Sequence, residues 1–340
     1  MTELSVGIVG CGAVTVRSHL PVLTAMDGIR VSALADPELQ RTRATAARFG
    51  VPKACADFRE LLDEVDALVL ALPHHLHAPI GEAVLRAGKH VLMEKPLANT
   101  AAECDRLMAA AEHGRATLAV AQVRRYMSAY RAVKDWLATD LLGELIGFEA
   151  EEGGAYNWPV ASDFFFRPEL SGGGVLMDTG AHVLDALLWW LGDLHVSAYT
   201  DDNAGGVEAD CTIQFRTAAG AEGALTLSRV RGLSNSVTLR GTRAELEVGL
   251  LGNQVRLTPK GAAIGLDGVF DGGSQSTLDL FREQAADWLR LMRGEPTEIA
   301  TAAESRRTIG VIGDCYAVRK PLCEPWQTID PATVGAQAHG

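Results

Sequence analysis

A short run of residues in the middle of the chain combines two carboxylic acids with an imidazole. Asp178, His182 and Asp185 follow the glycine run Gly172–Gly174 and are spaced at i, i+4 and i+7. If this segment is helical, the spacing places all three on one face, where polar groups are costly to bury without a partner or a task. An acid one turn away can orient His182 and stabilise its protonated form, so that His182 accepts the proton of a hydroxyl. A buried His–Asp pair with a purely structural role is the alternative.

Lys95 is a second candidate for chemistry. It lies between Glu94 and Pro96, directly after the apolar run His90–Met93. Beside a nicotinamide cofactor its ammonium group could polarise a carbonyl or support the deprotonation of an alcohol. An ordinary surface ion pair is the alternative interpretation of the same residues.

A glycine-rich turn directly follows the apolar run Leu4–Val9 and opens an amphipathic helical stretch. In this context Gly10 permits a tight turn, and Gly12 allows the backbone to approach a pyrophosphate held at the helix N-terminus. A glycine-rich turn that binds no nucleotide is the alternative. The residues expected to contact a dinucleotide here are Gly10, Gly12, Ala13 and Val14.

Asp36 lies at the end of the second predicted strand, 24 residues beyond Gly12. There a carboxylate can accept hydrogen bonds from the adenosine ribose and would repel a 2′-phosphate, so NAD is expected rather than NADP. Arg41 and Arg43 are two residues apart on the following helix and are expected to form a solvated face. Thr15 stands at the third position of the glycine pattern, where Gly or Ala is usual.

These residues need a scaffold, and the first 121 residues predict a doubly wound parallel sheet, because strand-length apolar runs alternate with helical stretches. The expected strands are Leu4–Val9, Arg30–Ala35, Ala67–Leu72, His90–Met93 and Thr117–Ala121. The expected helices are Ala13–Met26, Glu38–Phe49, Ala78–Ala87 and Ala101–His113. Residues 72–77 and 94–96 then follow two of the strands, at the carboxyl ends where such folds gather their ligands.

Beyond residue 121 consecutive short strands with Gly-containing connections predict an α+β domain with an open, mostly antiparallel sheet. The expected strands are Glu144–Gly153, Val207–Thr217, Ala221–Val230, Ser234–Gly241, Ala244–Leu250 and Gln254–Thr258. The expected helices are Ala129–Thr139, Gly174–Leu191, Leu278–Arg293 and Ala302–Val318.

The change of pattern divides the chain into a nucleotide-binding Rossmann domain, residues 1–121, and a substrate-binding and oligomerisation domain, residues 122–340. The last helix, about 302–318, has the position from which it could pack back on the first domain. An open sheet with helices on one side leaves an apolar face uncovered, so a homodimer or homotetramer is expected.

The composition narrows the class of partner. The 340 residues include 31 Lys and Arg against 43 Asp and Glu, which gives a formal net charge of −12. This balance lacks the positive charge that binds phosphate backbones, so no nucleic-acid partner is expected. No apolar run reaches the roughly 20 residues of a membrane-spanning helix, and the N-terminus has no signal-peptide pattern. A cytoplasmic protein without a membrane partner is expected.

No metal site is predicted. The three histidines between residues 74 and 77 have no accompanying Cys or acidic residues at metal-ligand spacing. The six cysteines form no Cys-x-x-Cys pair, which favours reduced, buried thiols. They are Cys11, Cys55, Cys104, Cys211, Cys315 and Cys323.

Taken together, the motifs resemble the glucose-fructose oxidoreductase / inositol dehydrogenase (Gfo/Idh/MocA) family. The resemblance rests on Gly10–Ala13, Asp36, Pro73 with His77, Glu94–Pro96, Gln122–Tyr126 and Gly172–Asp185. It implies that Lys95, Asp178 and His182 form the catalytic trio and that Asp185 lies near the substrate. Family members with a Tyr at the position of His182 tend to act as ketoreductases, so His182 favours alcohol oxidation.

With this resemblance, further residues are expected at the two binding sites. The expected cofactor-binding residues are Gly10, Gly12, Ala13, Val14, Asp36, Leu72, Pro73, His74, His77, Glu94, Lys95, Gln122 and Arg167. The expected substrate-binding residues are Lys95, Arg124, Tyr126, Asp178, His182 and Asp185.

We therefore expect an NAD-dependent dehydrogenase that oxidises a secondary ring hydroxyl of a sugar, aminosugar or cyclitol to a ketone. The acidic run Glu149–Glu152, with Asp163 nearby, favours a cationic, aminoglycoside-type substrate. Two alternatives stay open. One is a non-catalytic sensor of sugar or dinucleotide, which could lose Lys95 or His182 without penalty. The other is an enzyme that cleaves glycosides through a transient 3-keto intermediate.

Overall fold

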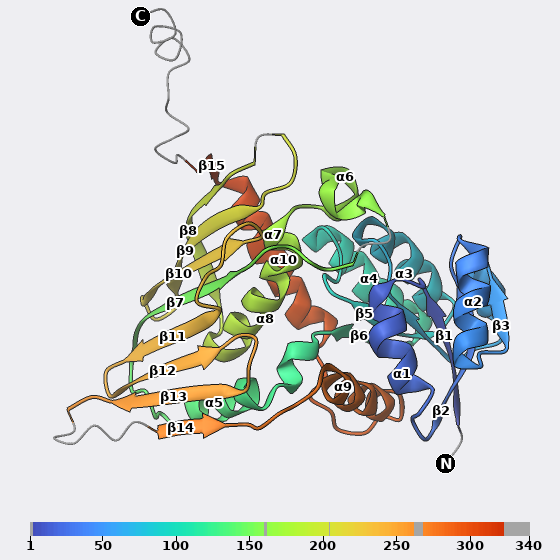
Figure 1. The fold of residues 1–340 in the computed structure, drawn as a ribbon, viewed down its shortest axis with the longest axis horizontal. Helices are drawn as coiled ribbons and strands as arrows, with labels where there is room; N and C mark the ends of the chain where they lie inside the picture. The colour runs from blue at the N-terminus through green and yellow to red at the C-terminus, as the bar shows by residue number, and fades with distance from the viewer. Residues whose placement is uncertain (1–2, 160–161, 204, 262–267, 323–340) are drawn as a thin grey trace, which may run out of the picture.

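The computed structural model describes residues 3–159, 162–203, 205–261 and 268–322. Two sheets stand at opposite sides of the molecule, and helices lie between them and on the far side of the first sheet (Figure 1). None of the helices in the described ranges is long and apolar enough to cross a membrane.

The first sheet is parallel and has the strand order β3-β2-β1-β4-β5-β6. Its strands are β1 (Leu4–Val9), β2 (Ile29–Ala35), β3 (Lys53–Cys55), β4 (Ala67–Leu70), β5 (His90–Glu94) and β6 (Leu118–Ala121). The middle strands are buried on both faces, as the continuous apolar run of β4 requires. The predicted doubly wound parallel sheet is confirmed.

Helices cover both faces of this sheet. The segments of the first half are η1 (Thr15–His19), α1 (Leu20–Leu23), α2 (Leu39–Phe49), η2 (Phe58–Leu61), η3 (His74–Leu76), α3 (His77–Arg86), α4 (Ala101–Gly114) and η4 (Val123–Tyr126). Leu20 of α1 packs with Val6 and Ile8 on one face, whereas Leu85 of α3 and Leu107 of α4 belong to the core on the other. The continuous helix expected at 13–26 instead contains a π turn, η1.

The second sheet has nine strands in the order β14-β13-β12-β11-β7-β10-β9-β8-β15. They are β7 (Leu145–Gly153), β8 (Leu194–Asp201), β9 (Asp210–Thr217), β10 (Glu222–Ser228), β11 (Ser236–Gly241), β12 (Ala244–Gly249), β13 (Gln254–Pro259), β14 (Gly268–Asp271) and β15 (Arg319–Pro321). The β7–β10 and β8–β15 pairs are parallel, and the other pairs are antiparallel. The expected open, mostly antiparallel sheet is confirmed.

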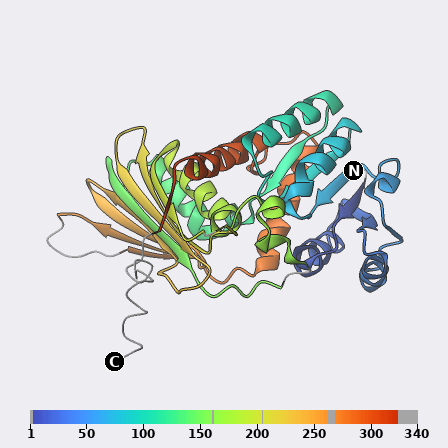
Figure 2. The same ribbon diagram turned by 90° about the horizontal axis from the view of Figure 1, so that it is seen from above.

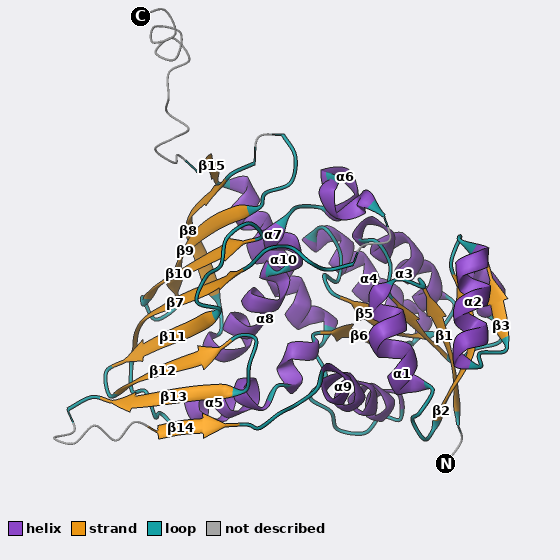
Figure 3. Ribbon diagram, in the orientation of Figure 1, coloured by secondary structure: helices purple, strands orange, loops and turns teal. Residues whose placement is uncertain are grey.

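The helical segments of the second half are α5 (Ser128–Ala138), η5 (Asp163–Phe166), α6 (Pro168–Ser171), α7 (Val175–Asp178), α8 (Gly180–Leu191), α9 (Thr277–Met292) and α10 (Ala302–Ala317). Both α8 and α10 lie between the sheets (Figures 1 and 3). Helix α10 packs on α4 and α8, and α9 places Trp288 in the same core as Val6 and Ile8. Two helices from the second half of the chain therefore cover the first half.

The two faces of the second sheet differ in character. Alternate side chains such as Phe148, Ile213 and Leu225 are buried on the inner face, against the helices. The outer face carries polar side chains such as Gln214 and Arg216, and no described helix covers it (Figure 2). The expectation of an apolar outer face is wrong, because the strands alternate apolar and polar residues.

Candidate active site

Lys95 and Asp178 form an ion pair that joins the two halves of the chain. Lys95 follows the last residue of β5, and Asp178 is the last residue of α7. Lys95 Nζ donates to Asp178 Oδ1 at 2.6 Å and to the Asp178 backbone carbonyl at 3.1 Å. The two side chains are only 15% and 16% exposed. An ammonium group has three donors, so the contacts of the described residues leave one for a ligand.

Arg229, directly after β10, makes a second contact to the Asp178 carboxylate. Its Nη2 donates to Asp178 Oδ2 at 3.0 Å and to the Gly174 carbonyl at 3.2 Å. Burial alone would raise the pKa of Asp178, but the Lys95 and Arg229 charges outweigh it and hold the pKa at about 2. Asp178 is therefore an anion at neutral pH. Arg229 was not predicted as a site residue, because the residues around it form no motif.

His182 lies in the first turn of α8. Burial and the charges of Lys95 and Arg124 hold the pKa of His182 well below its usual range, so the imidazole is neutral at pH 7. Its Nδ1 is buried and has no hydrogen-bond partner among the described residues. Both Asp178 oxygens bond cations, and no hydrogen bond joins Asp178 to His182 among the described residues, so no contact supports the predicted role of Asp178 as the residue that orients His182.

Two further polar atoms close to Asp178 are buried without a hydrogen-bond partner among the described residues, namely Tyr156 Oη and Arg229 Nε. The Arg229 guanidinium lies over the Tyr156 ring, 4.9 Å from its centre. Burial, with the nearby charge of Asp178, raises the pKa of Tyr156 to about 12. Buried polar groups are rarely left unpaired, so these atoms together with His182 Nδ1 suit a ligand that carries several hydroxyl groups.

Arg124, expected at the substrate, forms a two-pronged ion pair with Glu152 of β7, at 2.5 and 2.8 Å. Burial alone would lower the pKa of Arg124, but Glu152 outweighs it and raises the pKa. Glu149, from the same acidic run, bonds Arg240 at 3.0 Å. Glu149 and Glu152 therefore point to opposite faces of the strand and are each paired with an arginine, so neither carboxylate is free for a cationic substrate.

Asp185 and Tyr126 have structural partners in place of the expected substrate contacts. Arg125 donates to both Asp185 oxygens at 2.8 Å, and both side chains are buried. The Tyr126 hydroxyl donates to Asp287 of α9 at 3.0 Å, and its ring is buried. These contacts give both residues a structural role, and their expected contact with the substrate stays a prediction.

The glycine turn after β1 fits a dinucleotide. Gly10 has a φ of +97°, and a Cβ there would lie 2.1 Å from the Ala71 carbonyl oxygen. A Cβ on Gly12 would meet nothing within 4 Å, so the space over this residue is open. Ala13 and Val14 are half-exposed at the start of the helical segment, where N–H groups can hold a phosphate. Thr15 suits the third position, because it is fully buried and its hydroxyl donates to the Gly10 carbonyl at 2.7 Å.

Asp36 lies beside this turn at the end of β2. Its Oδ2 accepts the Cys11 N–H at 2.8 Å, and its Oδ1 accepts the Glu38 N–H at 2.9 Å. Arg41 donates to the same Oδ1 at 2.7 Å. The expectation that Arg41 belongs to a solvated face is therefore wrong, since α2 begins close enough to Asp36 for the guanidinium to reach it.

Two histidines after β4 join neighbouring loops. The ring nitrogens of His77 lie 2.7 Å from the Pro96 carbonyl and 2.9 Å from the Leu72 carbonyl, and the residue is fully buried. His74 donates to the Ser171 carbonyl at 2.8 Å and is also buried. His77 therefore links the loops after β4 and β5, and both of its ring nitrogens face backbone carbonyls, so the structure gives it a structural role.

Of the remaining residues expected to bind the cofactor, three lie at the carboxyl edge of the first sheet and one lies at the surface. Leu72 and Pro73 are half-exposed at the carboxyl end of β4. Gln122 is buried directly after β6. Arg167 forms a surface ion pair with Glu169 at 2.7 Å, with half of its side chain exposed, so no described contact directs it at the cofactor.

Glu94, the first residue of the Glu-Lys-Pro motif, links helix η1 to the Lys95 backbone. His19 Nε2 lies 2.8 Å from Glu94 Oε1, and the Lys95 N–H donates to Glu94 Oε2 at 3.2 Å. Both His19 and Glu94 are buried. His19, which lies on the helical segment that follows the glycine turn, was not predicted as a site residue.

Among the residues that the structure describes, no group of three or more His, Cys, Asp or Glu side chains could hold a metal ion. Five of the six cysteines are described, and all five are free and buried. Cys323 lies outside the described residues.

Comparison with known proteins identifies the family. Residues 4–122 match the description "Oxidoreductase family, NAD-binding Rossmann fold", and residues 130–247 match "GFO/IDH/MocA C-terminal domain". A dTDP-3,4-didehydro-2,6-dideoxy-alpha-D-glucose 3-reductase from Streptomyces violaceoruber is 33% identical over 255 residues, which cover 66% of this chain and 73% of the relative. The chain belongs to the Gfo/Idh/MocA oxidoreductase family. The resemblance inferred from the sequence is confirmed, and this protein is an NAD(P)-dependent oxidoreductase that acts on CH–OH groups.

Solved structures share the fold of this Gfo/Idh/MocA oxidoreductase. A 3-ketoreductase from Actinomadura kijaniata, in complex with NADP and TDP-benzene, matches with a TM-score of 0.82 and 24% identity over 94% of this chain and 99% of that one. A levoglucosan dehydrogenase in complex with NADH and levoglucosan matches with a TM-score of 0.83 and 19% identity, over 93% and 97% of the two chains. At these identities the likeness establishes the shared architecture.

Proposed function

We propose that this Gfo/Idh/MocA oxidoreductase oxidises a secondary ring hydroxyl of a sugar or cyclitol to a ketone, with NAD as the acceptor. The observation that carries the proposal is the Lys95–Asp178 ion pair beside a neutral His182. A hydroxyl that loses hydride from its carbon must also lose its proton, and these groups supply a base together with a cation.

Each of the three residues has a distinct role. His182 takes the hydroxyl proton, because its lowered pKa keeps the imidazole neutral at pH 7. Lys95 stabilises the negative charge that develops on the oxygen, using the donor that Asp178 does not occupy. Asp178, ionised and held by Arg229, fixes the direction of Lys95 Nζ. When bound, the nicotinamide of the dinucleotide accepts the hydride.

The cofactor would lie across the carboxyl edge of the first sheet. Gly12, Ala13 and Val14 would hold the pyrophosphate, and Asp36 would accept hydrogen bonds from the adenosine ribose. The carboxylate supports NAD over NADP. Arg41, which bonds Asp36, is the cation that a 2′-phosphate would need, so the preference depends on how these two side chains share their contacts.

The substrate class follows from chemistry at the site and from the relatives. Unpaired buried atoms of His182, Tyr156 and Arg229 suit a ring with several hydroxyl groups. The Streptomyces violaceoruber relative is named as a sugar 3-reductase, and the levoglucosan dehydrogenase structure contains a sugar. We do not extend the proposal to aminosugars, because Glu149 and Glu152 are paired with arginines.

A panel of substrates tests the proposal. Purified protein is incubated with NAD or NADP and with inositols, hexoses, levoglucosan, nucleotide sugars and aminoglycosides, while NADH or NADPH absorbance is followed. We expect NADH to form with at least one neutral sugar or cyclitol, and the Lys95→Ala variant to lose that activity. Absence of reduced cofactor with every compound, or full activity of Lys95→Ala, would refute the proposal. Glycoside cleavage without net NADH would favour the transient 3-keto reaction instead.

A further inference from the structure

Glu208, in the connection between β8 and β9, holds the start of the one-turn helix α7. Its Oε1 accepts the Gly174 N–H at 2.8 Å and the Leu176 N–H at 3.1 Å. Its backbone carbonyl accepts the Val175 N–H at 2.9 Å. The first N–H groups of a helix have no partner within the helix, and Gly174 has no side chain to cap them. Glu208 therefore satisfies the N–H groups at the start of the helix that ends in Asp178.

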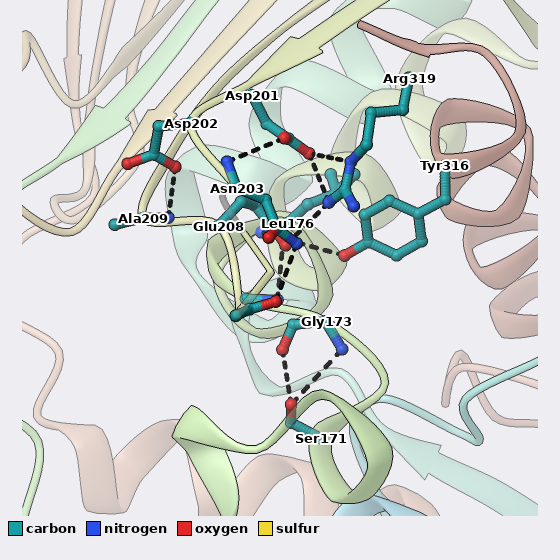
Figure 4. Close-up of polar contacts among 12 residues, drawn as sticks. Ser171, Gly173, Leu176, Asp201, Asp202, Asn203, Glu208, Ala209, Tyr316 and Arg319 are labelled. Carbon is teal, nitrogen blue, oxygen red and sulfur yellow. Dashed lines mark hydrogen bonds and ion pairs between the residues drawn. The ribbon is translucent and has the colours of Figure 1, made fainter. Parts of the chain in front are cut away.

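Glu208 is itself held in place from the far end of the chain. The Tyr316 hydroxyl of α10 donates to Glu208 Oε1 at 2.9 Å (Figure 4). Arg319 lies 3.7 Å from Oε2 and is bonded more closely to Asp201, at 2.6 Å. Glu208 is only 1% exposed. A carboxylate buried this deeply is tolerated because hydrogen bonds and a nearby cation compensate its lost hydration.

The glycine run before α7 allows this close packing. A Cβ on Gly173 would lie 2.0 Å from the Tyr316 hydroxyl oxygen, and a Cβ on Gly174 would lie 1.9 Å from the Glu208 carbonyl oxygen. A side chain at either position would push α7 away from Glu208. The glycines that mark the motif in the sequence are thus explained by contacts with Glu208 and Tyr316, and need no contact with a ligand.

The position of α7 decides the geometry of the catalytic pair. The Asp178 N–H bonds the Gly174 carbonyl at 3.1 Å, and Arg229 bonds both the Gly174 carbonyl and the Asp178 carboxylate. Lys95, from the other half of the chain, donates to the backbone carbonyl as well as to the side chain of Asp178. A shift at the start of this single turn would therefore displace Asp178 relative to Lys95.

We propose that Glu208 is a positioning residue for the Lys95–Asp178 pair: it fixes the start of α7 and thereby the distance between the two catalytic side chains. The importance of this pair for turnover rests on the proposed function. The geometric part, that loss of Glu208 frees Lys95 from Asp178, does not depend on the identity of the substrate.

A chemical probe of Lys95 tests the geometric part without a substrate. The protein is treated with trace acetic anhydride, and mass spectrometry gives the acetylation rate of Lys95 relative to exposed Lys260. An amine that is bonded to a carboxylate is acetylated slowly. The Asp178→Asn variant, which lacks this carboxylate, therefore gives the acetylation rate of a Lys95 freed from its ion pair. We expect Glu208→Ala to raise the relative rate about threefold to tenfold, the range for loss of one or two hydrogen bonds. Glu208→Gln, which keeps an acceptor for the two N–H groups, should stay close to wild type.

Kinetics on the best substrate of the panel test the consequence for turnover. Glu208→Ala should lower kcat about tenfold to hundredfold, as small displacements of catalytic groups do, while the KM for NAD changes less than about twofold. Glu208→Gln should restore most of kcat. The control is Asp279→Ala, which removes a cap of the same kind from α9 and should leave both the Lys95 acetylation rate and kcat unchanged.

The outcomes separate this proposal from the proposed function. Suppose that Lys95 is acetylated at the wild-type rate in Glu208→Ala but faster in Asp178→Asn. This result would overturn the positioning role and leave the proposed function intact. Full activity of Lys95→Ala would overturn the proposed function, while the acetylation result would still decide the geometry.

If Glu208→Ala does not fold, Tyr316→Phe is the second variant. It removes one hydrogen bond to Glu208 and should raise the acetylation rate of Lys95 by about twofold to threefold. An unchanged rate in that variant would count against the proposal.

Discussion

At the scale of residues, the sequence predicted which residues come together at the candidate site but not their partners. Lys95, Asp178 and His182 come together as expected from the motifs and the resemblance. Their spacing says which residues share a helix face, but it says nothing about side chains that arrive from a strand. Arg229 is such a side chain, and it changes the role of Asp178 from a partner of His182 to an anion held between two cations. Long-range contacts of this kind cannot be read from local spacing.

Removal of the base should stop oxidation while cofactor binding survives. His182→Ala is expected to lower kcat by about a hundredfold to ten-thousandfold, the usual range for a general base. The dissociation constant for NAD, measured by fluorescence titration, should stay within about twofold, because no cofactor contact is removed. His195→Ala, an exposed histidine on β8, is the control. Near-normal turnover of His182→Ala at pH 7 would transfer the role of base to another group.

The pH profile should show the lowered pKa of His182. The neutral imidazole is the active form, so activity is lost only when pH falls below the pKa of this group. Because burial and the charges of Lys95 and Arg124 lower that pKa, kcat should stay level as pH decreases through 6.5, where an ordinary histidine would already be half protonated. An acid limb of kcat centred near pH 6.5 would contradict this assignment.

The choice between NAD and NADP should depend on Asp36. Wild type is expected to bind NAD more tightly than NADP, because the carboxylate would repel a 2′-phosphate. Asp36→Ala removes that charge and releases Arg41. The ratio of NADP affinity to NAD affinity should therefore rise by about tenfold to a hundredfold, which is the contribution of one charged hydrogen bond. Isothermal titration calorimetry with both cofactors measures the change. Asp36→Ala combined with Arg41→Ala is the control, and it should lose the part of the gain in NADP affinity that Arg41 supplies.

At the scale of elements, the predictions succeeded where periodicity was strong and failed where elements were short or bent. Most long strands of both sheets lie within a few residues of their expected bounds, but β8, with eight residues, was not predicted. β3 and β15, with three residues each, are too short to show a pattern. The helix expected at 174–191 is interrupted at Thr179, between α7 and α8, although Thr179 keeps helical backbone angles. The Asp178 oxygens are bonded to Lys95 and Arg229, which come from other elements.

Asp185 should matter for stability rather than for substrate binding. It bonds the buried Arg125, which also reaches Glu304 of α10, so the three residues connect η4, α8 and α10. Asp185→Ala would leave Arg125 with Glu304 alone and should lower the free energy of unfolding by about 3 kcal/mol, since an unpaired buried charge is costly. Urea unfolding measures this loss. Asp193→Ala, which removes a surface ion pair with Arg307, should cost less than about 1 kcal/mol.

The same Asp185→Ala protein distinguishes the structural role from the expected substrate role. Its KM for the best substrate should equal that of wild type, because the Asp185 carboxylate is buried and bonded to Arg125. A variant as stable as wild type with a strongly raised KM would restore the interpretation that the sequence suggested.

At the scale of the molecule, the two halves are joined by more than the catalytic pair. Arg306 of α10 bonds Asp105 of α4 at 2.5 Å, and the Val120 N–H of the edge strand β6 donates to the Ala300 carbonyl at 3.0 Å. Trp288 of α9 is buried in the core of the first half. The sequence predicted the two types of sheet and the position from which the last helix could pack on the first half, but it did not indicate that α9 also packs there. The apolar faces of α9 and α10 could pack against either sheet, so the sequence pattern does not say which one they cover.

The character of the outer face of the second sheet determines what kind of interface two chains could form there. The sequence predicted a homo-oligomer because of an apolar uncovered face, whereas this face is polar. Arg240 lies there between Glu149, at 3.0 Å, and Glu245, at 3.5 Å. If two chains meet through this face, charged groups and water will fill much of the contact, and association will weaken as salt screens the charges.

We expect a homodimer or homotetramer at micromolar concentration in low salt, with dissociation as the salt concentration rises. Arg240→Glu would place three like charges together on the face and should shift the protein to a monomer, because like-charge contacts across an interface are strongly unfavourable. Light scattering coupled to size-exclusion chromatography measures the mass. Arg59→Glu, an exposed arginine on the first half, is the matched control and should leave the mass unchanged. A wild-type protein with the mass of one chain would refute the homo-oligomer, and an oligomer unaffected by Arg240→Glu would place its interface elsewhere.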